Sequence, residues 1–234
     1  MQKYLTVVSA VLSDAKRNEI IPENPAHMID LLDTEKREQF IPTEEDANRF
    51  LNALLDEPQE YKIFYVLALY TGCRRGKLCA LKWPDFIMTD KYRCVLTVSR
   101  SRSHIPGQGV QEGPTKNGHS RTIVIEEEIT SLVLSYCHYK NNLAQKAGLE
   151  VSPYLFADEN GNFIHPDTFT KHLRKIFKEN GFPDSFHLHP LRHYAISSLL
   201  HHGVDKQTVA ELAGHADTSF LERTYCHPQM ELKN

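Results

Sequence analysis

Hydrophobic and polar positions follow helical spacing along most of this 234-residue chain. The first such stretch predicts a helix over residues 1–18, where apolar side chains recur every three to four positions. Pro22 and an Asn-Pro pair at 24–25 then break the pattern. The charged run over 26–40 predicts a linker, so we expect the first helix to stand apart from the rest of the chain.

Beyond residue 40, the pattern predicts a series of helices divided by turns. A Thr-Glu-Glu-Asp sequence at 43–46 resembles a capping box and begins the first of them. Gly72 interrupts the apolar pattern between the second and the third. The expected helices cover residues 43–55, 60–70, 74–81, 126–147, 166–180, 190–202, 205–213 and 218–225.

Two segments have strand character instead. Residues 92–99 and 121–125 are rich in β-branched and other apolar side chains. The stretch between them is rich in Gly and Pro, which favour turns, so the two segments are expected in a small antiparallel sheet. The pattern as a whole predicts an α+β fold that is mostly helical.

Composition is that of an ordinary globular protein, with 41% hydrophobic and 24% charged residues. The chain has no apolar run long enough for a membrane span and no secretion signal, so we expect a cytoplasmic protein without a membrane partner. Five cysteines without a Cys-x-x-Cys pair argue against a disulfide framework and a cysteine-rich zinc site. The net charge of −3 gives no sign of a nucleic-acid partner, although residues 99–102 and 171–175 are locally basic.

Two segments place a cation where an anion would bind. Arg74 follows Thr-Gly-Cys at the start of a predicted helix, where a guanidinium and exposed backbone N–H groups suit an anion. Lys116 lies in a turn before the strand at 121–125, from which a lysine can reach into a groove of DNA. Taken alone, each residue is more commonly a solvated surface side chain.

A third segment is rich in histidine. His189 and Arg192 are three residues apart and share a helix face, where an imidazole beside a guanidinium makes a phosphate clamp. A rival interpretation is a metal site built from His187, His189 and His193. No carboxylate or cysteine with ligand spacing joins these histidines, so we favour the clamp.

The last segment contains His215, after Leu-Ala-Gly, and Tyr225 ten residues later. Either residue alone has an ordinary structural explanation. Together, two arginines, a lysine, two histidines and a tyrosine are the groups that metal-free phosphoryl transfer needs. Cations and imidazoles stabilise the developing charge, a tyrosine hydroxyl forms a covalent intermediate, and a lysine protonates the leaving oxygen.

These segments resemble the boxes of the tyrosine recombinases, also called the phage integrase family. Thr-Gly-x-Arg ends at Arg74, His-x-x-Arg-His begins at His189, and Leu-x-Gly-His ends at His215. Tyr225 stands in a Thr-Tyr-x-His context, and Lys116 corresponds to the family's hairpin lysine. Each box is loose, but their order and spacing agree from about residue 42 to 228.

The resemblance implies a catalytic fold of the α+β class, a mostly helical domain with a small antiparallel three-stranded sheet. It also implies the reaction. Tyr225 attacks a phosphodiester and keeps the 3′-phosphate, Lys116 protonates the leaving 5′-oxygen, and His189 assists proton transfer at the tyrosine. The phosphoryl oxygens are held by Arg74, Arg192 and His215. Neither a metal, a cofactor nor ATP is needed, because the phosphotyrosine bond conserves the energy.

The resemblance further implies a domain organisation and partners. Residues 1–40 correspond to the C-terminal remnant of a helical core-binding domain plus a linker, and residues 41–234 to the catalytic domain. The expected partner is double-stranded DNA at the core recombination site of a mobile element. We expect a monomer in solution and a homotetramer on DNA, with DNA-bending accessory proteins as further partners.

One departure from the family's pattern keeps alternatives open. Family members commonly have Glu or Asp three residues after the first arginine, where this chain has Lys77. A catalytically impaired DNA-binding module of the same fold is therefore the main alternative. A metal-dependent phosphoesterase using the histidines near 187–193 and a type IB topoisomerase are less favoured.

Overall fold

The computed structural model describes residues 2–29, 40–115, 118 and 120–214. The chain forms two compact units, Met1–Glu38 and Gln39–Asn234. This division lies close to the predicted domain boundary, whereas the correspondence of the first unit to a core-binding domain stays a prediction. Among the helices of the described residues, none is long and apolar enough to cross a membrane.

The first unit consists of helix α1 (Gln2–Arg17) and a 3-10 helix, η1 (Pro25–Met28). Asn24 joins them, since its side-chain oxygen caps η1 at the backbone N–H of Ala26 while its amide donates to the Ser9 carbonyl at 2.9 Å and to the Ser13 hydroxyl at 2.8 Å. The prediction of a linker over 26–40 is therefore wrong at its start, because the Asn cap and Pro25 favour a helical turn there.

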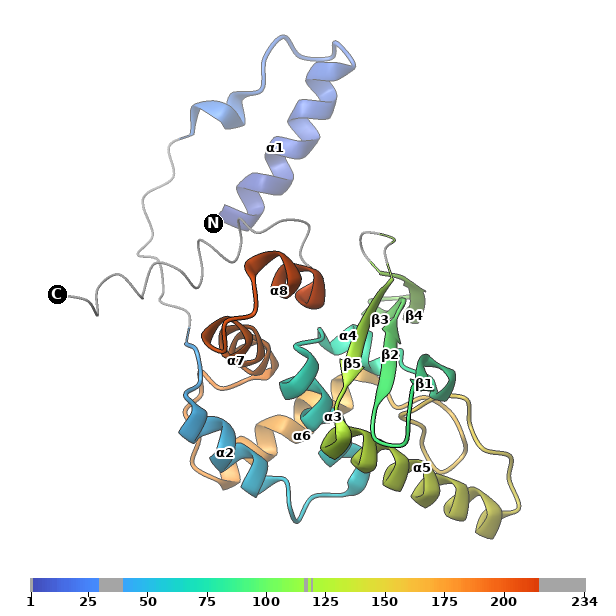
Figure 1. The fold of residues 1–234 in the computed structure, drawn as a ribbon. Coiled ribbons are helices and arrows are strands. Elements are labelled where there is room, and N and C mark those ends of the chain that lie inside the picture. The colour runs from blue at the N-terminus through green and yellow to red at the C-terminus, as the bar shows by residue number, and fades with distance from the viewer. Residues whose placement is uncertain (1, 30–39, 116–117, 119, 215–234) are drawn as a thin grey trace, which may run out of the picture. The chain divides into compact units, whose positions relative to one another are not determined.

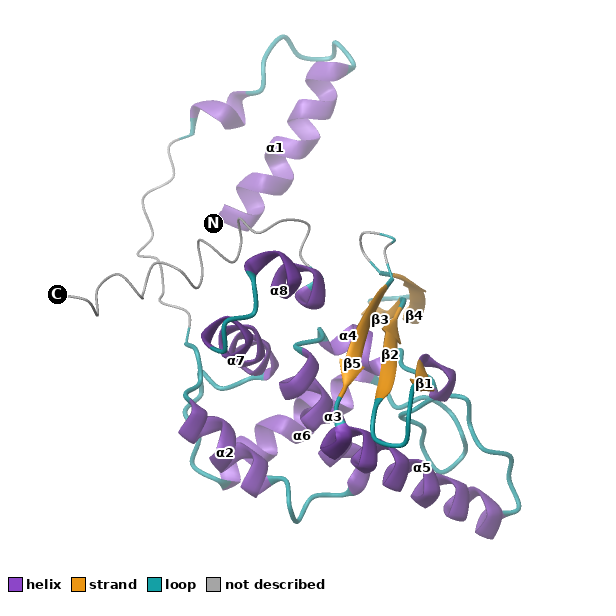
Figure 2. Cartoon of the chain, viewed as in Figure 1, coloured by secondary structure: helices purple, strands orange, loops and turns teal. Residues whose placement is uncertain are grey.

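The second unit is mostly helical, as predicted, with a small antiparallel sheet (Figures 1 and 2). Its helices are α2 (Glu44–Ala53), α3 (Gln59–Thr71), α4 (Arg75–Cys79), α5 (Glu127–Ala147), α6 (Pro166–Glu179), α7 (Leu188–His201) and α8 (Lys206–Ala213), with a 3-10 helix, η2 (Trp83–Asp85). The helix expected at 218–225 lies outside the described residues. Thr43 caps α2 in a capping box with Asp46, as its sequence predicts.

The sheet has three strands in the order β1-β2-β5, which confirms the predicted three-stranded antiparallel arrangement. Its strands are β1 (Phe86–Met88), β2 (Cys94–Val98) and β5 (Arg121–Ile125), and Leu96 pairs with Ile123 at its centre. Between β2 and β5 the chain forms a separate hairpin of β3 (Arg100–Ile105) and β4 (Gly109–Pro114), where the sequence indicated only turns.

Helix α3 forms the centre of the core, packed against α4, α5, α6 and α7 (Figure 1). Its aromatic side chains stack with those of its neighbours. Phe64 and Phe169 of α6 lie parallel with ring centroids 3.8 Å apart, and the Tyr65 hydroxyl donates to the Phe169 carbonyl at 2.7 Å. These contacts anchor the middle of α3, whose C-terminal end leads directly into the turn that holds Arg74.

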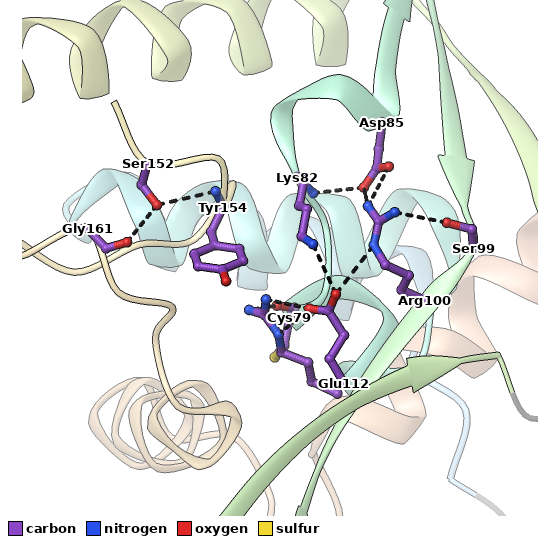
Figure 3. Close-up of polar contacts among 10 residues, drawn as sticks. Cys79, Lys82, Asp85, Ser99, Arg100, Glu112, Ser152, Tyr154 and Gly161 are labelled. Carbon is purple, nitrogen blue, oxygen red and sulfur yellow. Dashed lines mark hydrogen bonds and ion pairs between the residues drawn. The ribbon is translucent and has the colours of Figure 1, made fainter. Parts of the chain in front are cut away.

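The hairpin is held to the rest of the unit by a network of ion pairs (Figure 3). Glu112 of β4 accepts from Lys82 at 3.0 Å and from Arg102 of β3 at 2.5 and 2.8 Å. Arg100 donates to both carboxylate oxygens of Asp85 at 2.6 Å. Charge-assisted hydrogen bonds form only over a narrow range of distances and angles. The network therefore fixes the hairpin against η2 and the end of α4.

Candidate active site

Arg74 stands in a tight turn between α3 and α4. Gly72 ends α3 with a φ of +59°, a left-handed conformation that glycine adopts without strain. A Cβ atom there would lie 3.4 Å from the Cβ of Ala195 on α7, so glycine also allows α7 to approach closely. Thr71 stabilises the turn, since its hydroxyl donates to the Leu67 carbonyl and accepts from the Cys73 backbone N–H. The Thr-Gly-x-Arg sequence is thus required by the turn that presents Arg74.

Arg192 projects from α7 and is only 5% exposed. One guanidinium nitrogen donates to the Gly72 carbonyl, and another donates to the Ala213 carbonyl at 2.8 Å. Arg192 therefore ties the turn that presents Arg74 to the C-terminal end of α8, where the helix dipole favours a cation.

His189 lies one helical turn before Arg192, near the N-terminus of α7. Burial, followed by the charges of Arg192, His187 and Arg74, lowers the pKa of its imidazole. The ring is therefore neutral at neutral pH, and one of its nitrogens is free of a proton and able to accept one.

Arg74, His189 and Arg192 line one groove of about 890 Å³. Further basic side chains along it are Arg75, Arg174 and Lys178. The structure therefore brings together three of the six predicted catalytic residues on one concave surface. The other three, Lys116, His215 and Tyr225, lie outside the described residues, and all six roles stay predictions.

Two more cations adjoin this site, and the sequence did not indicate their proximity. Lys77 of α4 is 8% exposed, and Arg121 begins β5. A Cβ atom on Gly214 would collide with the Arg121 guanidinium and lie 3.0 Å from the Lys77 ammonium, so both groups meet at the C-terminal end of α8. Residues 77 and 121 are far apart in the sequence, so hydrophobic spacing carries no signal of this contact.

The cations around the turn repel one another. Burial, followed by the charge of Arg121 and smaller contributions from Arg74 and Arg192, lowers the pKa of Lys77 to about 8. Within the described ranges, no carboxylate forms an ion pair with Arg74, Lys77 or Arg121. Such a concentration of positive charge suits a bound anion.

The structure also bears on the rival metal site. The rings of His187, His189 and His193 are about 6 Å apart, with centroid distances of 6.3 and 6.1 Å, and their nitrogens do not converge on one point. In the described part of the chain, only His104, His165 and Asp167 form a group of three or more residues whose metal-ligating atoms lie close together. Two of the three already have other partners, since Asp167 pairs with Arg75 at 2.7 Å and His165 Nδ1 caps α6.

Comparisons with known proteins agree with this geometry. The sequence model of the phage integrase family matches residues 42–231. The chain is 24% identical to the ICEBs1 integrase of Bacillus subtilis (strain 168), with 97% of this chain and 61% of that protein aligned. It is 28% identical to a tyrosine recombinase XerC-like protein of Caldanaerobacter subterraneus, covering 82% of this chain and 52% of that protein. The chain thus spans about half to three fifths of these relatives.

Solved structures share the fold. The Tn1549 transposon integrase in complex with transposon right end DNA superposes with a TM-score of 0.78 at 19% identity, over 96% of this chain and 76% of that one. A λ integrase dimer bound to a core site superposes with a TM-score of 0.65 at 16% identity, over 94% of this chain and 70% of that one.

Proposed function

The chain belongs to the phage integrase family, and on this premise we propose that it is the catalytic part of a site-specific DNA recombinase. Its substrate is double-stranded DNA, which it cleaves and rejoins through a 3′-phosphotyrosine intermediate. The observation that supports this most is the groove where Arg74, His189 and Arg192 meet, in a region whose cations Arg74, Lys77 and Arg121 have no carboxylate partner among the described residues. A phosphodiester supplies the missing negative charge.

The reaction is a transfer of one phosphodiester bond to tyrosine and back. The Tyr225 hydroxyl oxygen attacks phosphorus, the bond to the 5′-oxygen breaks, and Lys116 donates a proton to that oxygen. Arg74, Arg192 and His215 stabilise the charge on the non-bridging oxygens in the transition state. A 5′-hydroxyl from another strand then reverses the step, so neither ATP nor a metal is consumed.

His189 is suited to receive the proton that Tyr225 loses. Its lowered pKa keeps the imidazole neutral at neutral pH, and its position in the groove places it beside both arginines. A protonated His189 would repel Arg192 and Arg74, so the proton is held only while negative charge is present in the groove.

We propose the same partners for this chain that the family resemblance implies. The Tn1549 and λ integrase structures contain DNA, which supports a DNA substrate here. A homotetramer on two core sites, a monomer in solution and accessory DNA-bending proteins complete the proposal. The unit Met1–Glu38 would be the C-terminal remnant of a core-binding domain.

Trapping the covalent intermediate tests the proposal. The protein is incubated in EDTA with a pool of end-labelled duplexes that carry nicks near the candidate cleavage positions, so that the short released strand diffuses away. We expect labelled DNA at protein mobility on a denaturing gel for the unaltered chain and for Tyr92→Phe, an exposed-tyrosine control. Tyr225→Phe should abolish the band. A band that survives in Tyr225→Phe, or disappears only when EDTA is added, contradicts the mechanism.

One observation favours a second candidate, a DNA-binding module without catalysis. Lys77 is buried beside Arg74 and Arg121 where family members commonly have an acid. If this repulsion displaces Arg74 from its catalytic position, DNA will bind and no covalent complex will form. Duplex binding by gel shift, measured beside the covalent assay, separates the two candidates.

A further inference from the structure

Lys77 stands where three elements meet near the groove. It projects from α4 and is almost completely buried, and its ammonium reaches the C-terminal end of α8 at Gly214. The Arg121 guanidinium arrives at the same point from β5. Lysine is seldom fully buried unless it is paired, so a buried Lys77 that meets a second, half-buried cation calls for an explanation.

The groups that face Lys77 are cationic or neutral on every side. Arg74 and Cys73 precede α4, Arg121 lies on β5 and Arg192 lies on α7. Cys73 favours the charged form of Lys77, but burial and Arg121 have larger effects in the opposite direction. The Ala213 carbonyl at the end of α8 accepts from Arg192.

Arg121 shows that this region is short of acceptors. One of its guanidinium nitrogens donates to the Cys73 sulfur at 3.0 Å. Its Nε and Nη1 atoms are buried and have no hydrogen-bond acceptor in the described part of the chain. Buried donors are nearly always satisfied in native proteins, and exceptions often mark functional sites. This region of unbalanced positive charge lies beside the groove lined by Arg74 and Arg192.

We propose that Lys77 is a further phosphate-site residue of this chain, whose ammonium strengthens the binding of an oxyanion held in the groove by Arg74 and Arg192. This inference rests on the proposed function, since it assigns a new contributor to the same anion site. Lys77 does not itself line the groove, so it acts through its charge across a poorly solvated region, where screening by water is weak. Lys77 repels its neighbouring cations while the site is empty, and it attracts the anion when one is bound.

The proposal has a consequence for pH. In the empty site the pKa of Lys77 is about 8, so Lys77 is mostly charged at pH 7 and mostly neutral at pH 9.5. A bound oxyanion favours the charged form and raises that pKa, so binding is accompanied by proton uptake at pH values above about 8. The affinity for an oxyanion therefore falls as pH rises through 8.

The test is sulfate binding by isothermal titration calorimetry at pH 7.0 and 9.5, at constant ionic strength. Sulfate remains a dianion across this range, so only the protein titrates. We expect Lys77→Met to bind sulfate roughly tenfold more weakly at pH 7.0, a difference of about 1.4 kcal/mol. The unaltered chain should weaken toward the Met variant at pH 9.5. Lys77→Arg, which stays charged, should bind equally well at both pH values.

Two controls make the outcome specific. Lys140 is also partly buried with a lowered pKa, but it lies on α5, where it donates to the Ala157 carbonyl. Lys140→Met should leave sulfate affinity and its pH dependence unchanged. Arg74→Ala should abolish sulfate binding, because Arg74 lines the groove itself. Circular dichroism confirms that each variant is folded.

The outcomes separate this inference from the proposed function. Loss of binding in Arg74→Ala with unchanged binding in Lys77→Met overturns the role of Lys77 and leaves the phosphate site intact. Unchanged binding in both variants, or no sulfate binding by the unaltered chain at pH 7.0, removes the anion site and the inference with it. The covalent assay with Tyr225→Phe remains an independent test of the reaction.

Discussion

Two groups of cations adjoin helix α4, and among the described residues carboxylates are present in only one of them. Beside β3, Arg100 and Arg102 pair with Asp85 and Glu112 (Figure 3). Around Lys77, by contrast, the described residues offer no carboxylate. Both groups adjoin α4 and each contains a buried cation, Arg102 in one and Lys77 in the other, so the difference that matters lies in their counter-charges.

Each arginine of the paired group has a carboxylate partner. The buried Arg100 Nε has no hydrogen-bond acceptor among the described residues, but it lies 3.8 Å from a Glu112 carboxylate oxygen. The Arg102 side chain is 2% exposed, donates to the Cys79 carbonyl and lies 4.4 Å from the ring centroids of both Tyr154 and Phe163. Glu112 adds a carboxylate to these contacts. A buried cation with such partners needs nothing from outside, and its function is to hold the hairpin.

The unpaired group consists of Arg74, Lys77 and Arg121, which have no carboxylate partner among the described residues. Arg121 has two buried donors without an acceptor in the described residues, and burial lowers the pKa of both Lys77 and Arg74. The presence of a buried cation therefore says little about its role until its counter-charge is located. Where the protein supplies the anion, the cluster is structural, and where it does not, the anion is expected from a ligand.

Removal of the central carboxylate from the paired group should have the largest effect. Glu112→Ala leaves Arg102 buried without its charge partner, so we expect a loss of about 3 kcal/mol in the free energy of unfolding, measured by urea denaturation at pH 7. Glu112→Gln retains an acceptor and should lose less. A loss below about 1 kcal/mol for the Ala variant would show that the aromatic contacts of Arg102 are sufficient.

Removal of a cation from the unpaired group should have the opposite sign. Lys77→Met relieves repulsion and desolvation, so we expect a gain of about 2 kcal/mol in unfolding free energy at pH 7. The pKa of Lys77 is lowered from 10.5 to about 8 on folding, so the unfolded chain binds more protons between these values. The unaltered chain therefore gains stability relative to the Met variant as pH rises from 8 to 10.5.

Urea denaturation of both proteins at several pH values between 7 and 10.5 measures this effect. Lys77→Arg remains charged over the whole range, so its destabilisation relative to Lys77→Met should not change with pH. If Lys77→Met is less stable than the unaltered chain at pH 7, an interaction of Lys77 outweighs the repulsion, and the two cation groups do not differ in the way we describe.

The sequence predicts the helices well, because the contacts that form a helix join residues close together in the sequence. The spacing of apolar residues gives α5, α6 and α8 to within a few residues, and β5 is predicted at its observed bounds. The hairpin of β3 and β4 was missed since its Arg-Ser-Arg-Ser-His sequence lacks an apolar alternation. The hairpin is held by an ion pair of Arg100 with Asp85 of η2 and a hydrogen bond from Arg102 to the Cys79 carbonyl of α4, which only the tertiary structure brings together.

The residues of the candidate active site likewise divide into those that local motifs predict and those that only long-range contacts reveal. Arg74, His189 and Arg192 were identified by short motifs, each of which has a local reason in a turn or a helix face. Arg121 was noted only as the first residue of a strand, since nothing near it in the sequence reveals its contact with Cys73. Long-range contacts decide which cations are paired, and this is the information that sequence patterns lack.

A smaller change in unfolding free energy is expected from a substitution where α4 contacts β3. A Cβ atom on Gly76 would collide with the Arg102 carbonyl and lie 2.7 Å from the Ser101 hydroxyl. Gly76→Ala should therefore push α4 away from the hairpin and cost about 2 kcal/mol in unfolding free energy, as overpacking does in cores. Gly113→Ala is the matched control, since a Cβ there meets no atom within 4 Å. Equal losses for the two variants in thermal or urea unfolding would contradict the close approach.

The smallest effect is expected at an ion pair that is close but exposed. Arg75 donates to Asp167 at 2.7 Å, with side-chain exposures of 35% and 44%. Asp167→Asn should cost only about 0.5 kcal/mol in unfolding free energy, because water screens the pair and the same Arg75 nitrogen also donates to the Thr170 hydroxyl at 2.7 Å. The loss should shrink further in 1 M NaCl. Urea denaturation of Asp167→Asn beside Glu112→Ala measures the contrast directly. If the two losses are equal, burial does not decide what a counter-charge is worth here, and the absence of carboxylates around Lys77 loses its significance.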